Sequence, residues 1–374
     1  MRRWPGLGRA RFMRAAPGTA RWQHANPANA QMRKTRRRTH SMQALVYTQP
    51  QELQLQQRPR PELVAGEVLL KIDAVGICGS DLHAWHGHDP RRKPGLELGH
   101  EFVGTVVESA AGGFAPGTRF TGNPLMACGV CDYCVQGRNN LCAGRTMIGM
   151  TRPGAYAQYM SIPAAALIAI PQQMSDIAAA LSEPAATAWH ALHRSMQMLT
   201  RPLHECRVLV IGGGAIGMLA GLLLKRWGVV RLTLSEPNPL RRSAVQTHVG
   251  CATLDPRAQA PGENRYDYIF DAVGARRTRQ QAIAAIAPGG LVMHAGLQDG
   301  ASEIDMRKLT LAQITLSGTY TYTTADLRAT VAALHEGALG DLAWVEQRPL
   351  AQGQQAFRDM AEGRSASAKI ILRP

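Results

Sequence analysis

The sequence has no apolar run of the roughly 18 residues that a membrane-spanning helix requires, and no apolar segment of the secretory type precedes its body. Cysteines are few, seven in 374 residues, and four of them lie within fifteen positions. In a chain without a secretory signal, this crowding indicates metal binding rather than disulfide bonds. We expect a soluble, cytoplasmic protein of two domains, since the length exceeds that of one small core.

Acidic residues are absent from residues 1–41, which hold eleven of the 42 Arg and Lys residues. The net charge of +15 therefore belongs mostly to this segment, and the remainder holds 31 basic against 27 acidic residues. An organelle transit peptide or a nucleic-acid arm would be compatible with this composition. We interpret the segment as a disordered extension or as upstream sequence read from an early start. Met42 opens MQALVYTQP, where we expect the folded protein to begin.

Residues 42–180 carry short apolar stretches broken by Gly and Pro. EVLLKIDAVGI (67–77) and FVGTVVES (102–109) are the clearest of them. Alternation over four to eight residues with frequent turn signals predicts an antiparallel β domain.

The pattern changes near residue 206. RVLVIG (207–212) is a continuous apolar run, typical of a parallel strand buried on both faces, and a helix is predicted over 215–228. Strands alternating with helices predict a doubly wound parallel α/β sheet. The further predicted elements are strands at 230–236, 266–274, 291–296 and 369–372, and helices at 239–250, 275–287, 324–336 and 351–362.

A glycine-rich turn joins the first of these strands to its helix. The residues Gly212, Gly213, Gly214, Ala215, Ile216 and Gly217 match G-x-G-x-x-G in the context that dinucleotide binding requires. Gly212 permits the tight turn, Gly214 lets the backbone approach the pyrophosphate, and Gly217 lets helix and strand pack closely. The helix N-terminus offers free N–H groups to the phosphates.

Glu236 stands at the end of the second strand, twenty-four residues after Gly212. A carboxylate there can accept hydrogen bonds from the adenosine ribose and would repel a 2′-phosphate. We therefore predict that NAD is bound in preference to NADP, through Gly212, Gly214, Ile216, Gly217 and Glu236. The neighbouring Arg241 and Arg242 leave NADP open as an alternative.

The spacing Cys128-x2-Cys131-x2-Cys134-x7-Cys142 is the most specific motif. Four thiolates on one short lobe suit a closed tetrahedral zinc site. The bacterial iron–sulfur run ends C-x3-C-P, whereas here seven residues precede Cys142 and Ala143 follows it. We predict a structural zinc with no open position for chemistry.

A catalytic zinc needs three protein ligands and one open position. The candidates are Cys78 in GICGSDLH (76–83), His100 and Glu101 in LGHEFVG (98–104), and Glu183 in LSEPAATAWHAL (181–192). Each alone has a structural explanation, such as a packed Cys, a loop His or a surface Glu. Their combination with a dinucleotide fold favours a metal site.

In order and motif, residues 42–374 resemble the zinc-dependent medium-chain dehydrogenase/reductase family, within the alcohol dehydrogenase superfamily. The Glu-Pro segment at 183 is similar to the branch of sorbitol, threonine and sugar-phosphate polyol dehydrogenases. The resemblance implies a GroES-like catalytic domain over 42–180, completed by 317–374, and a Rossmann NAD-binding domain over 181–316. It also implies two zinc ions per chain and a homodimer or homotetramer.

The resemblance further makes Cys78, His100 and Glu183 the catalytic zinc ligands and Glu101 an alternate or neighbouring carboxylate. Ser80 matches the relay hydroxyl, Asp81 the carboxylate that orients the histidine ligand, and His83 the group that passes the proton to solvent. The loop HAWHGHDPRRKP (83–94) departs from the family, and we expect its His86, His88, Arg91, Arg92 and Lys93 to form a solvated basic turn.

We therefore expect an enzyme that transfers a hydride between NAD and a small secondary alcohol or polyol, including a sugar-alcohol phosphate, without nucleic-acid or membrane partners. Two alternatives remain open. A catalytically silent cofactor-binding relative would hold one zinc, and a zinc-stabilised nucleic-acid binder would need a basic folded body.

Overall fold

The computed structural model describes residues 41–374. The interpretation of the basic segment 1–41 therefore lies outside the described residues, apart from Ser41. The first strand, β1 (Ser41–Gln49), begins one residue before Met42.

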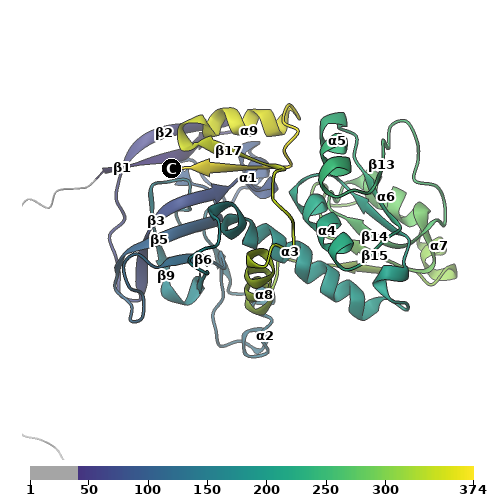
Figure 1. Ribbon diagram of the computed structural model, residues 1–374, viewed down its shortest axis with the longest axis horizontal. Coiled ribbons are helices and arrows are strands. Elements are labelled where there is room, and N and C mark those ends of the chain that lie inside the picture. Colours follow the sequence, from purple (N-terminus) through teal and green to yellow (C-terminus); the bar gives the residue numbers. More distant parts are fainter. Residues whose placement is uncertain (1–40) are drawn as a thin grey trace, which may run out of the picture. The chain divides into compact units, whose positions relative to one another are not determined.

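The β-rich half of the chain contains two main sheets (Figure 1). The smaller has the order β2-β1-β4, with β2 (Glu52–Pro59) and β4 (Leu96–Glu97) both antiparallel to β1. The larger has the order β10-β6-β5-β3-β18-β17, and β9 pairs with β3. Its strands are β3 (Glu67–Gly76), β5 (Glu101–Ser109), β6 (Arg119–Gly122), β9 (Tyr159–Pro163), β10 (Leu167–Ala169), β17 (Val345–Pro349) and β18 (Lys369–Arg373).

The predicted antiparallel pairing holds for β3, β5, β6, β9 and β10. Alternate residues of β3, among them Val68, Leu70 and Ile72, are buried in one apolar core. The last strand of the chain, β18, lies antiparallel beside β3, with Ile371 opposite Gly76. β17 pairs with β18 in parallel. The carboxyl-terminal segment is thus part of the same sheet as residues 67–76.

The second half is a six-stranded parallel sheet in the order β13-β12-β11-β14-β15-β16. Numbered from β11, this is the 3-2-1-4-5-6 order of Rossmann domains. Val208 and Val210 of β11 lie in one apolar cluster and Leu209 and Ile211 in another, so both faces are covered. The elements are β11 (Val208–Ile211), α4 (Ala215–Arg226), β12 (Leu232–Ser235), α5 (Pro239–His248), β13 (Ala252–Leu254), β14 (Tyr266–Asp271), α6 (Arg276–Ala285), β15 (Ile286–His294), α7 (Met306–Leu311) and β16 (Thr315–Gly318).

A long helix, α3 (Asp176–Met198), connects the two halves (Figure 1). Ser175 caps it by accepting a hydrogen bond from the Ala178 N–H, and its alanine-rich sequence packs against α8, α4 and β5. The remaining elements are α1 (Gly79–Trp85), β7 (Leu125–Met126), α2 (Asp132–Val135), β8 (Thr146–Met147), α8 (Thr324–His335) and α9 (Gly353–Ala361).

Candidate active site and metal centres

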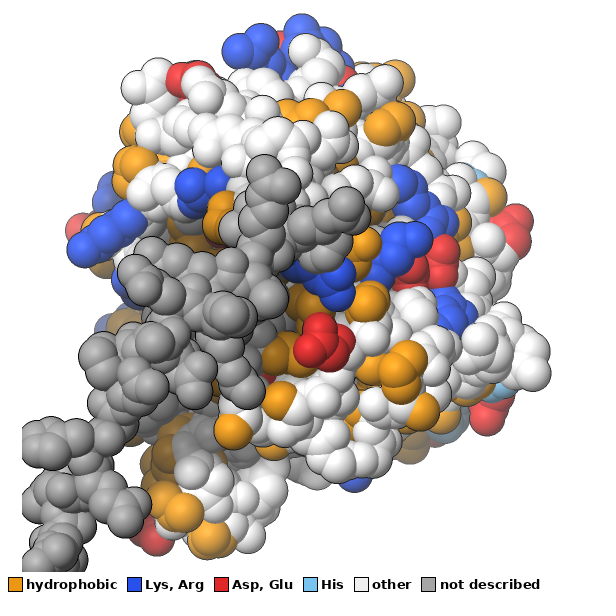
Figure 2. Space-filling view, turned by 90° about the vertical axis from the view of Figure 1, so that its left-hand side faces the viewer, with side chains coloured by type: hydrophobic (Ala, Val, Ile, Leu, Met, Phe, Trp, Pro, Cys, Tyr) orange, Lys and Arg blue, Asp and Glu red, His pale blue; other side chains and the backbone are white. Residues whose placement is uncertain are grey.

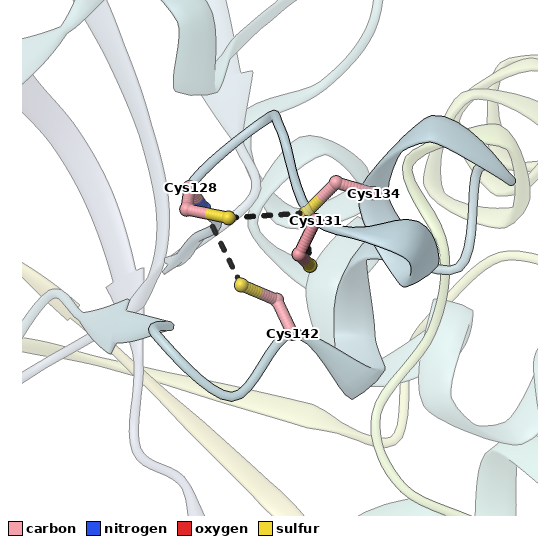
Figure 3. Close-up of side chains that lie close together, drawn as sticks. All are labelled: Cys128, Cys131, Cys134 and Cys142. Carbon is pink, nitrogen blue, oxygen red and sulfur yellow. Dashed lines mark hydrogen bonds between the residues drawn. The ribbon is translucent and has the colours of Figure 1, made fainter.

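The four cysteines of the 128–142 motif converge from the short helix α2, which carries Cys134, and from the segments beside it, and Figure 3 shows their side chains turned toward one another. The Sγ atoms of Cys131 and Cys134 are 3.5 Å apart, and those of Cys128 and Cys134 are 3.9 Å apart. A disulfide requires about 2.05 Å, and all four thiols are free. Backbone N–H groups of Val130 and Cys131 lower the pKa of Cys128 to about 6, which favours the thiolate. The arrangement fits a tetrahedral zinc site.

A second cluster combines Cys78, His100 and Glu101, whose ligand atoms all lie within 4.8 Å of one another. Cys78 is the N-cap of α1, directly after β3, and Glu101 opens β5. Because β3 and β5 are antiparallel, with Gly76 opposite Glu101, the end of one strand lies beside the start of the other. A thiolate, an imidazole and a carboxylate fit a zinc ion with an open position.

Asp81 supports this cluster from a fully buried position. Its Oδ2 accepts hydrogen bonds from the Tyr156 hydroxyl at 2.8 Å and the Cys78 N–H at 3.4 Å, while Oδ1 lies 3.4 Å from His100 Nδ1. Burial raises the pKa of Asp81, but the charges of His100 and Arg92 and the Tyr156 hydroxyl outweigh it and lower the pKa to about 2. The carboxylate is therefore ionised and faces the imidazole, as an orienting role requires.

Glu183, the third expected ligand, lies on α3 and is buried. Its Oε1 accepts a hydrogen bond from the Tyr322 hydroxyl at 2.7 Å. Burial and the nearby charge of Glu101 raise the pKa of Glu183 to about 7, against the opposing effect of His100. The structure thus brings Glu183 close enough to interact with the cluster, but it groups Glu101 rather than Glu183 with Cys78 and His100.

Lys369 is a residue of this site that the sequence-based set omits. It opens β18, is 1% exposed, and its Nζ donates to Glu101 Oε1 at 2.7 Å, Glu101 Oε2 at 2.6 Å and the Ile77 carbonyl at 2.8 Å. In the sequence, a lysine at the start of the strand KIIL looks like an ordinary exposed residue at a strand end. Only the pairing of β18 with β3 reveals its partner, which is 268 residues away in the sequence.

The expectation of a solvated basic turn over 83–94 is wrong for Arg92. Its residue exposure is 4%, and its Nη1 donates to Asp89 Oδ2 at 2.7 Å. Its Nε donates to the Gly149 carbonyl at 3.0 Å and its Nη2 to Ser80 Oγ at 3.3 Å. The Arg92 guanidinium is buried together with Asp89, its ion-pair partner in the same loop. The residue types alone do not reveal this ion pair.

Elsewhere in this segment Arg91, Lys93, His86 and His88 are exposed, as expected, and so is His83, whereas Ala84, Trp85 and Asp89 are buried. His83 lies one helical turn after Ser80 on α1, and its ring centroid is 5.1 Å from that of His88. His86 and His88 stack at 5.7 Å. Ser80 itself is half-buried at the start of the same helix.

The glycine-rich turn has the backbone geometry that its motif predicts. Gly212 has a φ of +98°, which favours glycine, and a Cβ at Gly217 would lie 1.8 Å from the Gly212 carbonyl oxygen. Gly214 is the N-cap of α4, and a Cβ there would meet nothing within 4 Å. Ile216 is partly buried and packs against the apolar core. The backbone at Gly214 is therefore open to close approach by a ligand, at the helix terminus where phosphates bind.

Glu236 lies against this turn and is 5% exposed. Its Oε2 accepts a hydrogen bond from the Gly213 N–H and its Oε1 one from the Asn238 N–H, each at 2.7 Å. The nearby arginines are also engaged: Arg242 pairs with Asp255 at 3.0 Å, and Arg241 donates to the Met360 carbonyl at 3.3 Å.

The surface of the folded part is not uniformly basic. On the face shown in Figure 2, Lys and Arg side chains form separate groups, with uncharged, hydrophobic and acidic side chains between them. This agrees with the 31 basic and 27 acidic residues beyond position 41. Within residues 41–374, none of the helices combines the length and the apolarity that crossing a membrane would require.

Comparisons with known proteins match both halves of the chain. The alcohol dehydrogenase GroES-like domain matches residues 64–172, and the zinc-binding dehydrogenase domain matches residues 215–336. The L-threonine 3-dehydrogenase of Chelativorans sp. is 30% identical over 349 residues, which cover 89% of this chain and 99% of that protein. The L-galactonate-5-dehydrogenase of Escherichia coli is 29% identical over 343 residues, covering 88% and 99%.

Among solved structures, a Sinorhizobium meliloti protein described as a zinc-binding dehydrogenase, with NADP bound, superposes with a TM-score of 0.80. It is 28% identical, and the match covers 90% of this chain and 100% of that one. The fold, the four-cysteine lobe and the similarity to these relatives all indicate the same protein family. The chain therefore belongs to the zinc-dependent medium-chain dehydrogenase/reductase family, the nicotinamide-linked alcohol and polyol dehydrogenases.

Proposed function

We propose that the protein oxidises a secondary alcohol group of a small polyol or hydroxy acid, with NAD as the hydride acceptor. The observation that carries this proposal is that the ligand atoms of Cys78, His100 and Glu101 lie within 4.8 Å of one another, with Ser80 two residues after Cys78 at the start of α1. The names of two relatives specify threonine and galactonate, both hydroxy acids. The exposed imidazoles of the 83–88 segment offer hydrogen bonds rather than an apolar wall, which favours a polar substrate.

For the catalytic metal we propose Cys78, His100 and Glu183 as ligands. Lys369 engages both carboxylate oxygens of Glu101, whereas Tyr322 engages one oxygen of Glu183. Glu183 would therefore lose fewer hydrogen bonds than Glu101 on binding a cation. When bound, zinc supplies a Lewis acid that favours ionisation of an alcohol. Four thiolates at Cys128, Cys131, Cys134 and Cys142 would hold the second, structural zinc.

The protein's own groups then handle the proton. Ser80 is half-buried two residues after Cys78, and its hydroxyl can accept a hydrogen bond from the alcohol while donating its own. Asp81, ionised and buried, keeps the His100 ring in place. His83 is exposed on the same helix as Ser80 and can release the proton to water.

For the cofactor we propose NAD. Glu236 places a carboxylate beside Gly213, where a 2′-phosphate would be repelled, and Arg241 and Arg242 already have partners. The Sinorhizobium meliloti neighbour binds NADP, so the preference must be measured directly. We expect kcat/KM to be at least about 100-fold higher with NAD, a difference of about 2.7 kcal/mol. A higher kcat/KM with NADP would contradict the assignment of Glu236.

We further propose that two copies of the chain associate along β16, the edge strand of the parallel sheet. Leu316 on this strand is 42% exposed, and Leu311, at the end of the preceding helix α7, is 73% exposed. Unpaired backbone groups and apolar side chains on an edge favour pairing with a second strand. Light scattering should give the mass of a dimer or tetramer, and Leu316→Lys should shift it toward the monomer. A monomeric wild type would contradict this proposal.

The function is tested by NAD reduction with a panel of polyols, hydroxy acids such as L-threonine and L-galactonate, sugar-alcohol phosphates and simple secondary alcohols. Zinc is counted on the same sample. Turnover of one polar class with two zinc ions per chain is the expected result. One zinc and no turnover would instead identify a silent cofactor-binding relative. Preference for a phosphorylated substrate would contradict the proposed class, since Arg91 and Arg92 both pair with Asp89.

A further inference from the structure

Arg92 is a buried cation that the proposed reaction does not yet use. Its side chain is 1% exposed, and its Nη2 lies 3.3 Å from Ser80 Oγ and 3.9 Å from Asp81 Oδ1. These two neighbours are the proposed relay hydroxyl and the carboxylate that faces His100. The guanidinium therefore contacts both the proposed proton relay, through Ser80, and the support of the metal cluster, through Asp81.

Direct recognition of a substrate anion by Arg92 does not fit this geometry. Its Nη1 is paired with Asp89, whose side chain is only 4% exposed, and its Nε is bonded to the Gly149 carbonyl. An anion would have to displace a buried carboxylate to reach the guanidinium. Removing one partner of a buried ion pair is strongly unfavourable. The hydrogen bonds of the Arg92 side chain are thus made within the protein, and it does not serve as a ligand-binding group.

The contact with Ser80 has a specific effect on the hydroxyl. A serine hydroxyl has one donor and two acceptor positions, and a guanidinium only donates. Arg92 therefore occupies one acceptor position of Ser80 Oγ and directs the O–H away from itself. One acceptor and one donor position remain, which is what a relay needs to take a proton from an alcohol and pass its own onward.

We propose that Arg92 is a positioning residue for Ser80, held in place by Asp89, so that the loop after α1 sets the orientation of the relay hydroxyl. This inference rests on the proposed function of Ser80. Asp89 also pairs with Arg91 through Nε at 2.8 Å, but the Arg91 side chain is 66% exposed, whereas that of Arg92 is 1% exposed. Arg91 is therefore the matched control.

The test is a double-mutant cycle on the zinc-loaded enzyme, using Arg92→Gln, Ser80→Ala and the combination. Arg92→Gln should lower kcat about 10–100-fold, the usual cost of losing an outer support, with KM for NAD and zinc content unchanged. In the Ser80→Ala background the same substitution should have no further effect. Arg92→Lys should recover part of the loss, and Arg91→Gln should change kcat less than about twofold.

Multiplicative effects of the Arg92 and Ser80 substitutions would overturn the proposal, because they would mean that Arg92 acts on stability or on another group. Crystal structures of the Arg92→Gln and Arg91→Gln proteins give a reading that needs no substrate. The Ser80 side chain should change its dihedral angle in the first and keep it in the second. An unchanged Ser80 in Arg92→Gln would also overturn the proposal. A wild type inactive on the whole panel would count against the proposed function alone.

Discussion

The cysteines of the four-cysteine lobe lie on and around the short helix α2, and their exposure ranges from exposed Cys128 to buried Cys142, whereas the cluster of Cys78, His100 and Glu101 lies at the junction of two long strands. Cys128 is exposed, while His100 and Glu101 are 2% and 1% exposed. The lobe uses four identical donors adjacent in sequence. The buried cluster combines three different residue types, and separate elements position them.

The difference concerns what holds each group of ligands together. Within the lobe, Val130 and Val135 are 82% and 72% exposed, so little apolar burial stabilises it. A bound metal would supply most of its cohesion, as in small zinc domains. The buried cluster is supported by side chains around it: Asp81 faces His100, Lys369 holds Glu101 and Tyr322 holds Glu183. We therefore expect the lobe to need a bound metal for its structure, and the buried cluster to keep its structure without one.

The largest effect should follow from Cys78→Ala. Loss of a donor from the buried cluster should reduce turnover below detection and lower the zinc content from two ions per chain to one. Thermal stability and NAD affinity should change little, because β3, β5 and the Gly212 turn remain. Cys251→Ala, a partly buried cysteine outside both clusters, is the control. Full activity in a Cys78→Ala protein with one zinc would remove Cys78 from the metal site.

Cys131→Ala should affect the lobe itself. It should also remove one zinc, but the result should be local unfolding of residues 128–142, since the site's binding energy, about 10–16 kcal/mol in small zinc peptides, is folding energy. Limited trypsin digestion should then cut after Arg138, with the secondary structure of the rest retained. Resistance at Arg138 in a protein that has lost this zinc would show that the lobe is stable without metal.

Lys369→Met should destabilise the buried site by about 3–5 kcal/mol, because it leaves the Glu101 carboxylate buried without its partner. Urea unfolding measures this difference. Adding Glu101→Gln should recover part of the lost stability. Lys71→Met, at an exposed position of β3, serves as the comparison. Equal effects of the two lysine substitutions would mean that the Lys369 contact contributes no more than an exposed charge.

The smallest effect should come from a charge pair remote from both clusters. Arg207 donates three hydrogen bonds to Asp267 and, chiefly through its side chain, lowers the pKa of that carboxyl to about 2. Because the folded pKa lies below the unfolded value, the contribution is complete above about pH 4 and disappears as the pH falls toward 2.

Arg207 is partly exposed, so solvent screening limits the contribution to about 1 kcal/mol. Asp267→Asn should lower the free energy of unfolding by this amount at pH 5 and by less at pH 3, with zinc content unchanged. The exposed Glu263→Gln is the control. A stability loss in Asp267→Asn that is equal at both pH values would show that the carboxylate's charge does not contribute.

The features that could be predicted from the sequence are those whose partners are close along the chain. The Gly212 turn and the four cysteines each span fifteen residues or fewer, and their roles follow from local spacing. The α/β pattern also predicted β11, α4 and β12 to within two residues at each end. β15 begins at Ile286, earlier than the predicted 291, because Pro288 and Gly289 suggest a turn but lie within the strand.

Contacts between distant segments could not be predicted in this way. Tyr156 reaches Asp81 across 75 residues, and Lys369 reaches Glu101 across 268. Arg92 looked like a surface cation because its burial depends on Asp89 and on the Gly149 carbonyl. In each case the residue type is ordinary, and its environment is created only when the sheet and its loops assemble.

The place of Lys369 in β18 has a consequence for biosynthesis. The lysine and the carbonyl of Ile77 that it contacts are separated by 292 residues. At roughly 5–20 residues per second, a ribosome needs roughly 15–60 s to cover that interval. During this time Cys78, His100 and Glu101 are already made, but the end of β3 at Val75 and Gly76 lacks its β18 partner and the cation that balances Glu101 does not yet exist. A nascent chain must therefore acquire its catalytic metal late, or bind it first in surroundings more negative than those of the finished enzyme.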